Sequence, residues 1–548
     1  MYDYIIVGAG SAGCVLANRL SADPACQVLL IEAGPRDRHP FIHMPAGLSR
    51  LVNLRSVNWN YETEPQAALG GRRLWWPRGK VLGGSSSINA MCYVRGDARD
   101  YDDWARAGAT GWDWQGVLPY FRRSEHNEHG ADALHGGDGP LHVSDLRHRN
   151  PLSEAFVSAG VQAGMRANPD FNGSAQAGVG FYQVTQKAGA RCSAAVAYLH
   201  PARARRNLHV LTGVQVQRVV VESGKAVGVA YAQRGQAQLA RAAREVLLCA
   251  GAVNSPQLLM LSGIGPADHL QAHRLPVHAD LAGVGGNLQD HLDVCTLVHT
   301  VPGVSYDRAS ELAIALRYFL GGHRGAGTSN IAEAGGFFRS PLAADARADI
   351  QLHFVPAMLD DHGRHRLPGD GYTLHACFLR PRSRGHLRLR SADPLAAPAI
   401  DPAYLSDAEG FDLRMMLECA RLSGRILAQP AFDTWRGKPI FPERDDLDDA
   451  GLAAFVRRKA ETIYHPVGTC RMGADDDPQA VLDPELRVRG VSGLRVIDAS
   501  AMPTLPGGNT NAPVIMLAER AADLLLGAGP PPLRHTATSV GKTPTRST

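Results

Sequence analysis

His465 is the residue of this chain whose surroundings most favour acid–base chemistry. It lies within Glu461 to Gly473, among small residues, and Pro466 holds its backbone extended. An imidazole that titrates near neutral pH is the usual general base in enzymes. The chain has 22 histidines, however, and most histidines in proteins are solvated or lie in the core. The segment alone therefore leaves a catalytic and a structural role open.

A glycine-rich turn near the N-terminus has the residue types that bind a dinucleotide. Gly8, Gly10 and Gly13 follow the apolar run Tyr4–Val7 and precede a helical segment. The first glycine allows a tight turn, the second lets the backbone approach a pyrophosphate, and the third lets helix and strand pack closely. Glu32 ends the next apolar run, where a carboxylate can accept hydrogen bonds from a ribose 2′-hydroxyl. This context predicts a dinucleotide site rather than a structural turn.

Three further loops combine glycine with small polar residues. Residues 78–89 carry two cations but lack the order of an NTP-binding loop. Residues 251–265 have the pattern of a turn and a helix with proline near its start, which is more typical of a structural element. Residues 506–513 place Gly-Gly-Asn-Thr-Asn before a helix, as an anion-facing turn or an ordinary capped helix would. Taken singly, none of the three decides between cofactor binding and a plain loop.

The apolar pattern predicts the elements that would position these residues. Short strands are expected around a helix in the first 34 residues, with later strands of the same domain further on: 4–7, helix 15–20, 28–31, 208–221 and 245–249. We predict an α/β nucleotide-binding domain interleaved with other material. Residues 374–379 and 386–390 have strand patterns, which predict an antiparallel sheet in a second, substrate domain. A last helix is expected over 514–526.

Composition narrows the function classes. The 548 residues carry 57 Lys and Arg against 53 Asp and Glu, a net charge of +4, which argues against an extended nucleic-acid groove. Nine scattered cysteines without a C-x-x-C pair predict reduced thiols in a cytosolic enzyme. No secretory signal or long apolar span is visible, so any membrane contact would be peripheral. The tail 527–548 is predicted to be disordered.

Histidine spacing gives no support for a metal centre. His353, His362 and His365 are too loosely spaced, without neighbouring ligands of fixed geometry, to indicate a zinc site. We therefore predict no metal.

Taken together, five stretches resemble the glucose-methanol-choline (GMC) family of FAD-dependent oxidoreductases, in the family's order and from Tyr2 to about Leu526. The sequence is most similar to bacterial long-chain alkanol dehydrogenases, and next to choline dehydrogenases. The motifs that carry this resemblance are the N-terminal fingerprint, 78–96, 251–266, 464–469 and 496–511.

The resemblance implies a Rossmann-like, GR2-type FAD domain interleaved with a substrate domain on a large antiparallel sheet. The FAD domain would take 1–160, 196–295 and 456–526, and the substrate domain 161–195 and 296–455. Carried over by motif, the cofactor-binding residues would be Gly8, Gly10, Ser11, Gly13 and Glu32 for the ADP half, Gly84 and Asn89 along the pyrophosphate and flavin, Val216 near adenine and Asp498 near the ribityl phosphate. Covalently flavinylated members have histidine where this chain has Ile88, which implies non-covalent FAD.

The implied reaction is oxidation of a primary alcohol to an aldehyde, with hydride transfer to flavin N5. His465 would be the base and Asn509 its partner, while Glu333 and His353 are candidates to line the substrate pocket. For Glu333, a structural salt bridge is the favoured role. Electrons would pass to a quinone-type acceptor, which implies a cytoplasmic enzyme loosely held at the inner face of the cytoplasmic membrane. An O₂-using alcohol oxidase, a choline dehydrogenase, a hydroxynitrile lyase and a non-catalytic flavin-binding module stay open, as do the alcohol's chain length and the oligomeric state.

Overall fold

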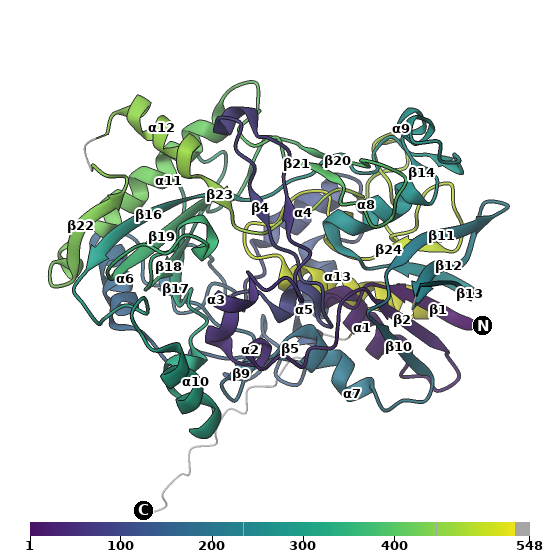
Figure 1. Cartoon of the computed structure of the whole chain (residues 1–548), viewed down its shortest axis with the longest axis horizontal. Coiled ribbons are helices and arrows are strands. Elements are labelled where there is room, and N and C mark those ends of the chain that lie inside the picture. The colour runs from purple at the N-terminus through teal and green to yellow at the C-terminus, as the bar shows by residue number, and fades with distance from the viewer. Residues whose placement is uncertain (234, 445–446, 532–548) are drawn as a thin grey trace, which may run out of the picture.

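The computed structural model describes residues 1–233, 235–444 and 447–531. Two halves lie side by side, one built on a mostly parallel sheet and the other on an antiparallel sheet (Figure 1). The chain crosses between them several times, so each half is made of segments that are far apart in the sequence. The predicted fold class, an α/β nucleotide domain interleaved with an antiparallel substrate domain, is confirmed.

The nucleotide half contains a seven-stranded sheet in the order β10-β2-β1-β13-β12-β11, with β24 paired to β13. Its strands are β1 (Tyr2–Val7), β2 (Val28–Glu32), β10 (Leu208–Thr212), β11 (Val216–Glu222), β12 (Lys225–Gln233), β13 (Gln236–Leu248) and β24 (Leu494–Val496). Val7 pairs with Ile31 and with Leu248, and Leu248 pairs with Val496, all in parallel ladders. The carboxyl ends of these four strands therefore share one sheet edge, where cofactors of open α/β sheets bind.

Three helices of this half begin at that edge. They are α1 (Ser11–Leu20) after β1, α8 (Gly251–Leu261) after β13, and α13 (Asn511–Leu526) after β24. α1 and α13 pack against each other beside the sheet. The last helix starts at Asn511, three residues before the predicted Val514, because the Asn-Ala-Pro sequence already forms its first turn.

The substrate half contains a second seven-stranded sheet in the order β22-β16-β19-β18-β17-β7, with β23 paired to β16. Its strands are β7 (Gly178–Phe181), β16 (Leu292–Thr300), β17 (Ala334–Phe338), β18 (Ile350–Val355), β19 (Gly371–Phe378), β22 (Arg436–Phe441) and β23 (Glu461–Thr462). Every ladder is antiparallel. Helices α6 (Pro151–Gln162) and α11 (Phe411–Leu427) contact each other and pack on this sheet. Strand β23 belongs to the substrate sheet although it lies inside 456–526. The predicted domain boundaries stay predictions.

Two predicted strands differ in their placement. The predicted strand at 386–390 forms β20 (His386–Arg388), but it pairs with β21 (Ala399–Asp401) in a separate two-stranded sheet instead of extending the large one. The β-rich block 208–221 is two strands at opposite ends of the nucleotide sheet, because Gly213 turns the chain with φ +71°. Of the predicted tail, residues 532–548 lie outside the described residues.

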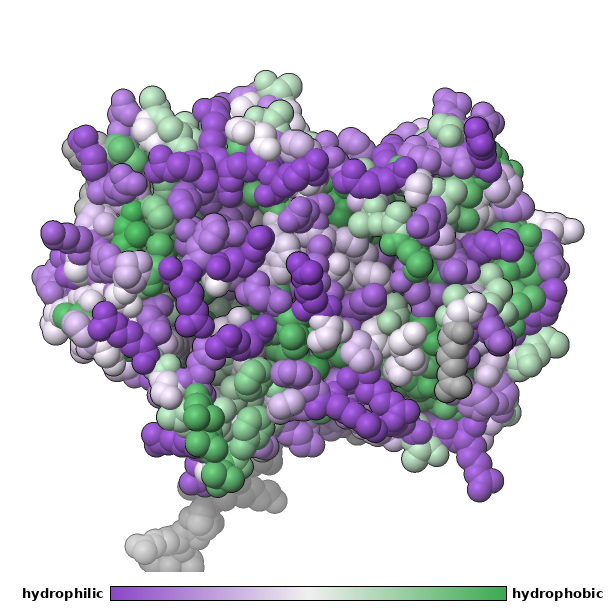
Figure 2. All heavy atoms as spheres, viewed as in Figure 1, coloured by the Kyte–Doolittle hydropathy of each residue, from purple (hydrophilic) through white to green (hydrophobic). Residues whose placement is uncertain are grey.

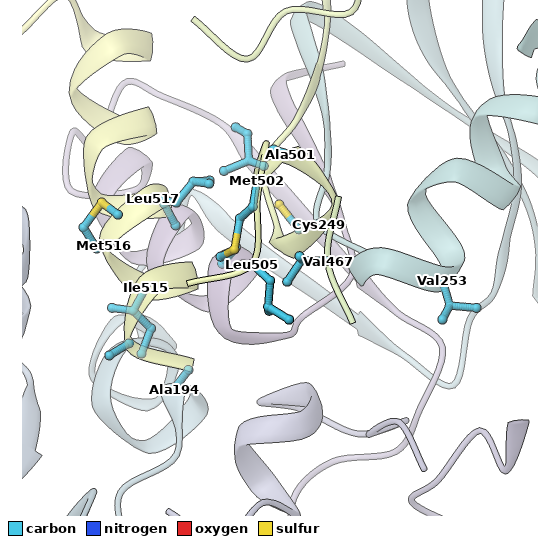
Figure 3. Packing of buried hydrophobic residues seen from close by; sticks show 14 of the residues in the cluster. Ala194, Cys249, Val253, Val467, Ala501, Met502, Leu505, Ile515, Met516 and Leu517 are labelled. Atoms are coloured by element: carbon cyan, nitrogen blue, oxygen red, sulfur yellow. The ribbon is translucent and has the colours of Figure 1, made fainter. Parts of the chain in front are cut away.

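The core between the sheet edge and α13 fixes the loops that carry the candidate chemistry. Buried side chains from distant segments meet there, among them Cys249, Val467, Leu505 and Ile515 (Figure 3). Each lies within a few residues of a predicted site loop, so close packing sets the relative positions of those loops. All nine cysteines are free and buried. Among the described helices, none has the length and apolar character needed to cross a membrane.

Candidate active site

One cavity of about 370 Å³ reaches from the nucleotide sheet edge to the substrate sheet. Its walls contain most of the predicted site residues, including Gly8, Gly10, Ser11, Glu32, Gly84, Asn89, Val216, His465, Asp498 and Asn509. His353 and Ile88 line it as well. Gly13 and Glu333 do not belong to its walls. A volume of this size is typical of a ligand or cofactor site.

The nucleotide side of the cavity has the donors that a pyrophosphate needs. Ser11, Gly251 and Asn511, the first residues of α1, α8 and α13, all line it. Helix N-termini present unpaired N–H groups and the positive end of the helix dipole. The Ser11 hydroxyl donates to Asn511 Oδ1 at 2.7 Å, which joins two of these termini. A Cβ added to Gly251 would meet nothing within 4 Å, so its backbone is open to the cavity. Three converging helix termini fit a dinucleotide cofactor.

The fingerprint glycines are required by close backbone approaches. A Cβ on Gly13 would lie 1.9 Å from the Gly8 carbonyl oxygen, which accounts for a fingerprint residue outside the cavity walls. A Cβ on Gly84 would lie 2.7 Å from Gly10 Cα, and the Gly83 N–H donates to the Ala9 carbonyl at 2.7 Å. The loop 78–89 therefore packs directly on the fingerprint turn.

Two buried carboxylates hold backbone around the cavity. Glu32 accepts from the Ala9 and Gly34 N–H groups, each at 2.8 Å, and burial raises its pKa to about 7. Asp498 accepts from Gly251 N–H at 2.9 Å and from Ser500 N–H at 2.8 Å. Burial raises the pKa of Asp498 too. Both side chains thus fix the turns that precede α1 and α8, in addition to facing the cavity.

Asn89 is positioned by a buried arginine that the sequence did not single out. Arg191 donates from Nη1 to the Asn89 carbonyl at 2.6 Å and to its Oδ1 at 2.9 Å. It also donates to the carbonyls of Ile42 and Ser86. Burial lowers the pKa of Arg191 to about 9. Arg191 therefore holds the end of the loop 78–89 in place.

On the opposite wall, hydrogen bonds determine which nitrogen of His465 carries the proton. His291 Nε2 contacts the Leu379 carbonyl at 3.1 Å, so it must carry the proton and donate. In the neutral ring His291 Nδ1 is then an acceptor, and it lies 3.0 Å from His465 Nδ1. His465 Nδ1 must therefore donate. Its Nε2, which faces Asn509, is left with a lone pair.

The amide of Asn509 is oriented by the same network. Its Nδ2 donates to His465 Nε2 at 3.2 Å, and its Oδ1 accepts from Gln351 Nε2 at 3.0 Å. Gln351 Nε2 also donates to the Tyr182 hydroxyl at 3.1 Å, which itself donates to the Leu352 carbonyl at 2.7 Å. A continuous chain of donors and acceptors thus runs from Leu379, the residue after β19, through the cavity wall to Leu352 in β18.

Burial keeps these imidazoles neutral. Desolvation, and then the neighbouring His291, His353 and Arg78, hold the pKa of His465 well below its ordinary value. Desolvation lowers the pKa of His291 and of His353 to about 3 each. The imidazole of His465 is therefore unprotonated at neutral pH.

Backbone geometry presents His465 to the cavity. Tyr464 has φ +72°, a left-handed conformation that is uncommon for a bulky residue and is typical of constrained sites. The His465 N–H donates to Asp290 Oδ1 at 2.7 Å, and Thr462 donates to Asp290 Oδ2 at 2.6 Å. Asp290 and His291, adjacent in the chain, thus hold the backbone and the ring of the same histidine.

Two predictions about the substrate wall have different outcomes. His353 lines the cavity, and its Nδ1 is buried without a partner in the described part of the chain. Glu333 does not line the cavity and makes no salt bridge with any residue that the structure describes. It accepts from Ser153, Tyr306, Ser329 and the Asn150 N–H, all neutral donors, at 2.6 to 2.8 Å. The prediction of a structural salt bridge for Glu333 is therefore wrong, because these four donors already satisfy the carboxylate.

The far part of the cavity wall carries two more imidazoles, His362 and His375. His375 Nδ1 lies 2.6 Å from Asp293 Oδ2 and 3.0 Å from Cys295 Sγ. These three side chains come close enough to share an ion, but they hydrogen-bond one another. The absence of a metal stays a prediction.

A parallel nucleotide sheet with a glycine fingerprint, joined to an antiparallel sheet that brings a neutral imidazole to the same cavity, defines a dinucleotide-dependent oxidoreductase. The sequence matches the GMC oxidoreductase family over residues 2–293 and 381–518, and the chain belongs to that family. It is an FAD-dependent oxidoreductase that acts on CH–OH donors.

Known proteins match nearly the whole chain. An alcohol dehydrogenase (acceptor) of Pseudomonas putida is 50% identical over 96% of both chains. Mitochondrial choline dehydrogenase of Homo sapiens is 48% identical over 96% of this chain and 90% of its own length. Among solved structures, pyridoxine 4-oxidase from Mesorbium loti is 33% identical, with a TM-score of 0.88 over 96% of this chain and all of its own.

Proposed function

We propose that the protein oxidises primary alcohols to aldehydes, with His465 as the base, and passes the electrons to a quinone-type acceptor. The observation that carries the proposal is the lone pair of His465 Nε2 at the cavity: His465 Nδ1 donates to His291 Nδ1, which leaves Nε2 as the acceptor that faces Asn509. The family membership supports alcohol oxidation in general. The base, the hydride transfer and the acceptor are the proposed parts.

His465 and Asn509 have different roles toward the hydroxyl group of the alcohol. A substrate hydroxyl would replace Asn509 Nδ2 at the lone pair of His465 Nε2 and donate its own hydrogen there, while its oxygen accepts from Asn509 Nδ2, whose direction is set by Gln351. His465 accepts the proton as the carbonyl forms, and His291 Nδ1 accepts the hydrogen bond from the resulting imidazolium. When bound, FAD supplies the hydride acceptor. General base catalysis of this kind contributes about 10²–10⁴-fold.

FAD would be held by the nucleotide side of the cavity. Gly8, Gly10, Ser11 and Gly84 would bind the pyrophosphate region through backbone N–H groups and helix termini. Glu32 and Val216 would contact the adenosine, while Asn89 and Asp498 would lie along the remaining length. Gly13 would act through packing alone. The aliphatic Ile88 in the wall supports non-covalent attachment, since it cannot form the bond.

The charges of the cavity wall favour an uncharged alcohol over choline. Among the described wall residues the carboxylates are Glu32 and Asp498, both on the nucleotide side. Asp293 is close to the substrate part, but its side chain is only 1% exposed and His375 lies between it and the cavity. A quaternary ammonium in the substrate part would therefore meet imidazoles and Tyr464, without a carboxylate among the described wall residues there.

His465→Ala tests the proposal directly. The variant should keep bound FAD but lose at least 100-fold in the rate of anaerobic flavin reduction by alcohol in stopped-flow. Reduction at the wild-type rate would reject His465 as base. His323→Ala, a histidine on the surface, is the matched control and should reduce normally.

A substrate screen in the same assay separates the alternatives. An alcohol series from methanol to dodecanol, with choline, should reduce the flavin with the uncharged primary alcohols. Reduction by choline alone would identify a choline dehydrogenase, and no reduction by any alcohol would indicate a lyase or a binding module. Peroxide formation in air, compared with quinone reduction, identifies an oxidase.

A further inference from the structure

Helix α10 (Glu311–Leu320) exposes a large apolar surface. Leu312, Leu316, Phe319 and Leu320 are 70%, 50%, 43% and 82% exposed. Their spacing of four, three and one residues places them on one face of the helix. Figure 2 shows this face as a hydrophobic patch on the projection that α10 forms at the lower left of the molecule. Clustered exposed leucines of this kind mark a binding surface rather than ordinary surface composition.

Contacts of Tyr318 and Ser310 hold the opposite side of α10 against the protein, so the apolar face of the helix points outward. Tyr318, its one buried residue, donates from its hydroxyl toward the carbonyls of His43 at 3.1 Å and Gly189 at 3.2 Å. The Tyr318 ring also stacks on His323 at 4.5 Å. Ser310 caps the helix N-terminus through the Ala313 N–H. These contacts hold one side of α10 and leave the leucine side uncovered.

The rim of the patch is positively charged. Glu311 is paired with two arginines, Arg50 at 2.6 Å and Arg366 at 3.1 Å. Arg317 and Arg324, in and just after the helix, make no ion pair with any residue that the structure describes. An apolar helix face with arginines at its edge is the pattern of a helix that lies in a membrane interface.

The cavity reaches the surface next to this helix. Ser49 is exposed and also lines the cavity, and its neighbours Leu48 and Val52 line it too. Arg50, in the same short helix α3 (Leu48–Leu51), forms the ion pair with Glu311. A surface on which α10 docks would therefore also lie close to this opening.

We propose that the α10 face, defined as Leu312, Leu316, Phe319 and Leu320, docks on an anionic lipid membrane. The leucines and Phe319 would enter the headgroup region while Arg317 and Arg324 contact lipid phosphates. A second copy of the chain fits less well. In a two-fold dimer the arginine rims would face each other and repel, and one ten-residue helix offers less than the roughly 800 Å² per partner of a stable interface.

Vesicle flotation with the full-length holoenzyme tests the docking. The protein should float with phosphatidylcholine vesicles that contain about one third phosphatidylglycerol, and less with phosphatidylcholine alone or at high salt. Leu316→Glu/Leu320→Glu should lower the bound fraction on the order of tenfold or more, and Arg317→Glu/Arg324→Glu should remove the preference for anionic vesicles. Leu239→Glu/Leu395→Glu, at side chains 50% and 69% exposed elsewhere, is the matched control and should bind normally.

Three outcomes would overturn this proposal. They are wild-type protein that fails to float with anionic vesicles, a Leu316→Glu/Leu320→Glu variant that floats like wild type, and a wild-type dimer that this variant dissociates in light scattering. The last would identify a second copy as the occupant. Flavin reduction by alcohol, measured without lipid, should be unchanged in every variant, so failure of the docking is distinguishable from failure of the proposed function.

Discussion

The two walls of the cavity are built in different ways. The nucleotide wall consists largely of backbone: glycine turns, three helix N-termini and the two carboxylates that hold them. The substrate wall consists of side chains on strands β18 and β19 and in the loops at His465 and Asn509, and His291, just before β16, supports it through hydrogen bonds. The nucleotide wall depends on glycines, because an added Cβ would collide with neighbouring backbone. The substrate wall depends on each hydrogen-bond donor having its acceptor. Substitutions in the nucleotide wall should therefore impair FAD binding, whereas substitutions in the substrate wall should lower the reaction rate and leave FAD bound.

The largest effect is expected where a side chain would fill the backbone wall. Gly84→Val should abolish FAD binding, because the added Cβ meets Gly10 Cα at 2.7 Å and φ is +54°. The ratio of flavin to protein absorbance in the purified enzyme measures this. Gly70→Val carries the same left-handed strain at φ +68° but meets nothing within 4 Å, and should keep its FAD. If Gly84→Val retains full FAD, the close approach of the two loops is not what shapes the cofactor site.

This contrast also explains what could be predicted from the sequence. Gly8, Gly10, Glu32 and the loops at Gly84 and Asn509 stand in local patterns, so their place in the cavity could be predicted. Strand β20 shows what local patterns cannot predict. Its alternation of apolar and polar residues predicts a strand, but not the strand with which it pairs.

The residues that support His465 and Asn509 do not stand in a recognisable local sequence pattern. His291 meets His465 across 174 residues of chain, and nothing in the residues around either one predicts the contact. Arg191 and Gln351 are likewise ordinary in sequence and act only through tertiary contacts. Glu333 shows the converse, a charged residue in the substrate half whose four neutral partners could not be deduced from its neighbours.

The next effect tests the side-chain wall through a positioning residue. His291→Phe should keep FAD but lower the rate of flavin reduction about tenfold or more. The reason is that His465 Nδ1 loses its acceptor, so nothing holds the proton on Nδ1 and the lone pair on Nε2. His291→Asn, which can still accept through Oδ1, should recover part of the rate. Equal rates for the Phe and Asn variants would indicate a packing role only, and loss of FAD would contradict the division between the two walls.

A smaller effect is expected from pH. Burial lowers the pKa of His465, so its imidazole stays unprotonated as pH falls. If His465 is the base, as proposed, protonation should reduce activity only below that lowered pKa. The value of kcat/KM for alcohol should therefore be constant between about pH 8 and about pH 6, whereas an imidazole of ordinary pKa would lose roughly three quarters of its activity at the lower limit. A decline centred near the ordinary imidazole pKa would mean that His465 is exposed to water in the working enzyme.

The smallest effect on activity is expected for Tyr182, the last side chain of the hydrogen-bond network. Tyr182→Phe removes the acceptor for one Gln351 hydrogen but leaves the bond from Gln351 to Asn509, so kcat/KM should fall only about two- to fivefold with FAD content unchanged. Tyr101→Phe is the matched control: its hydroxyl is equally buried and donates to the Arg95 carbonyl at 2.5 Å, outside this network. It should not change the reduction rate. A loss for Tyr182→Phe as large as for His291→Phe would show that the amide orientation, rather than the tautomer of His465, limits the reaction on this wall.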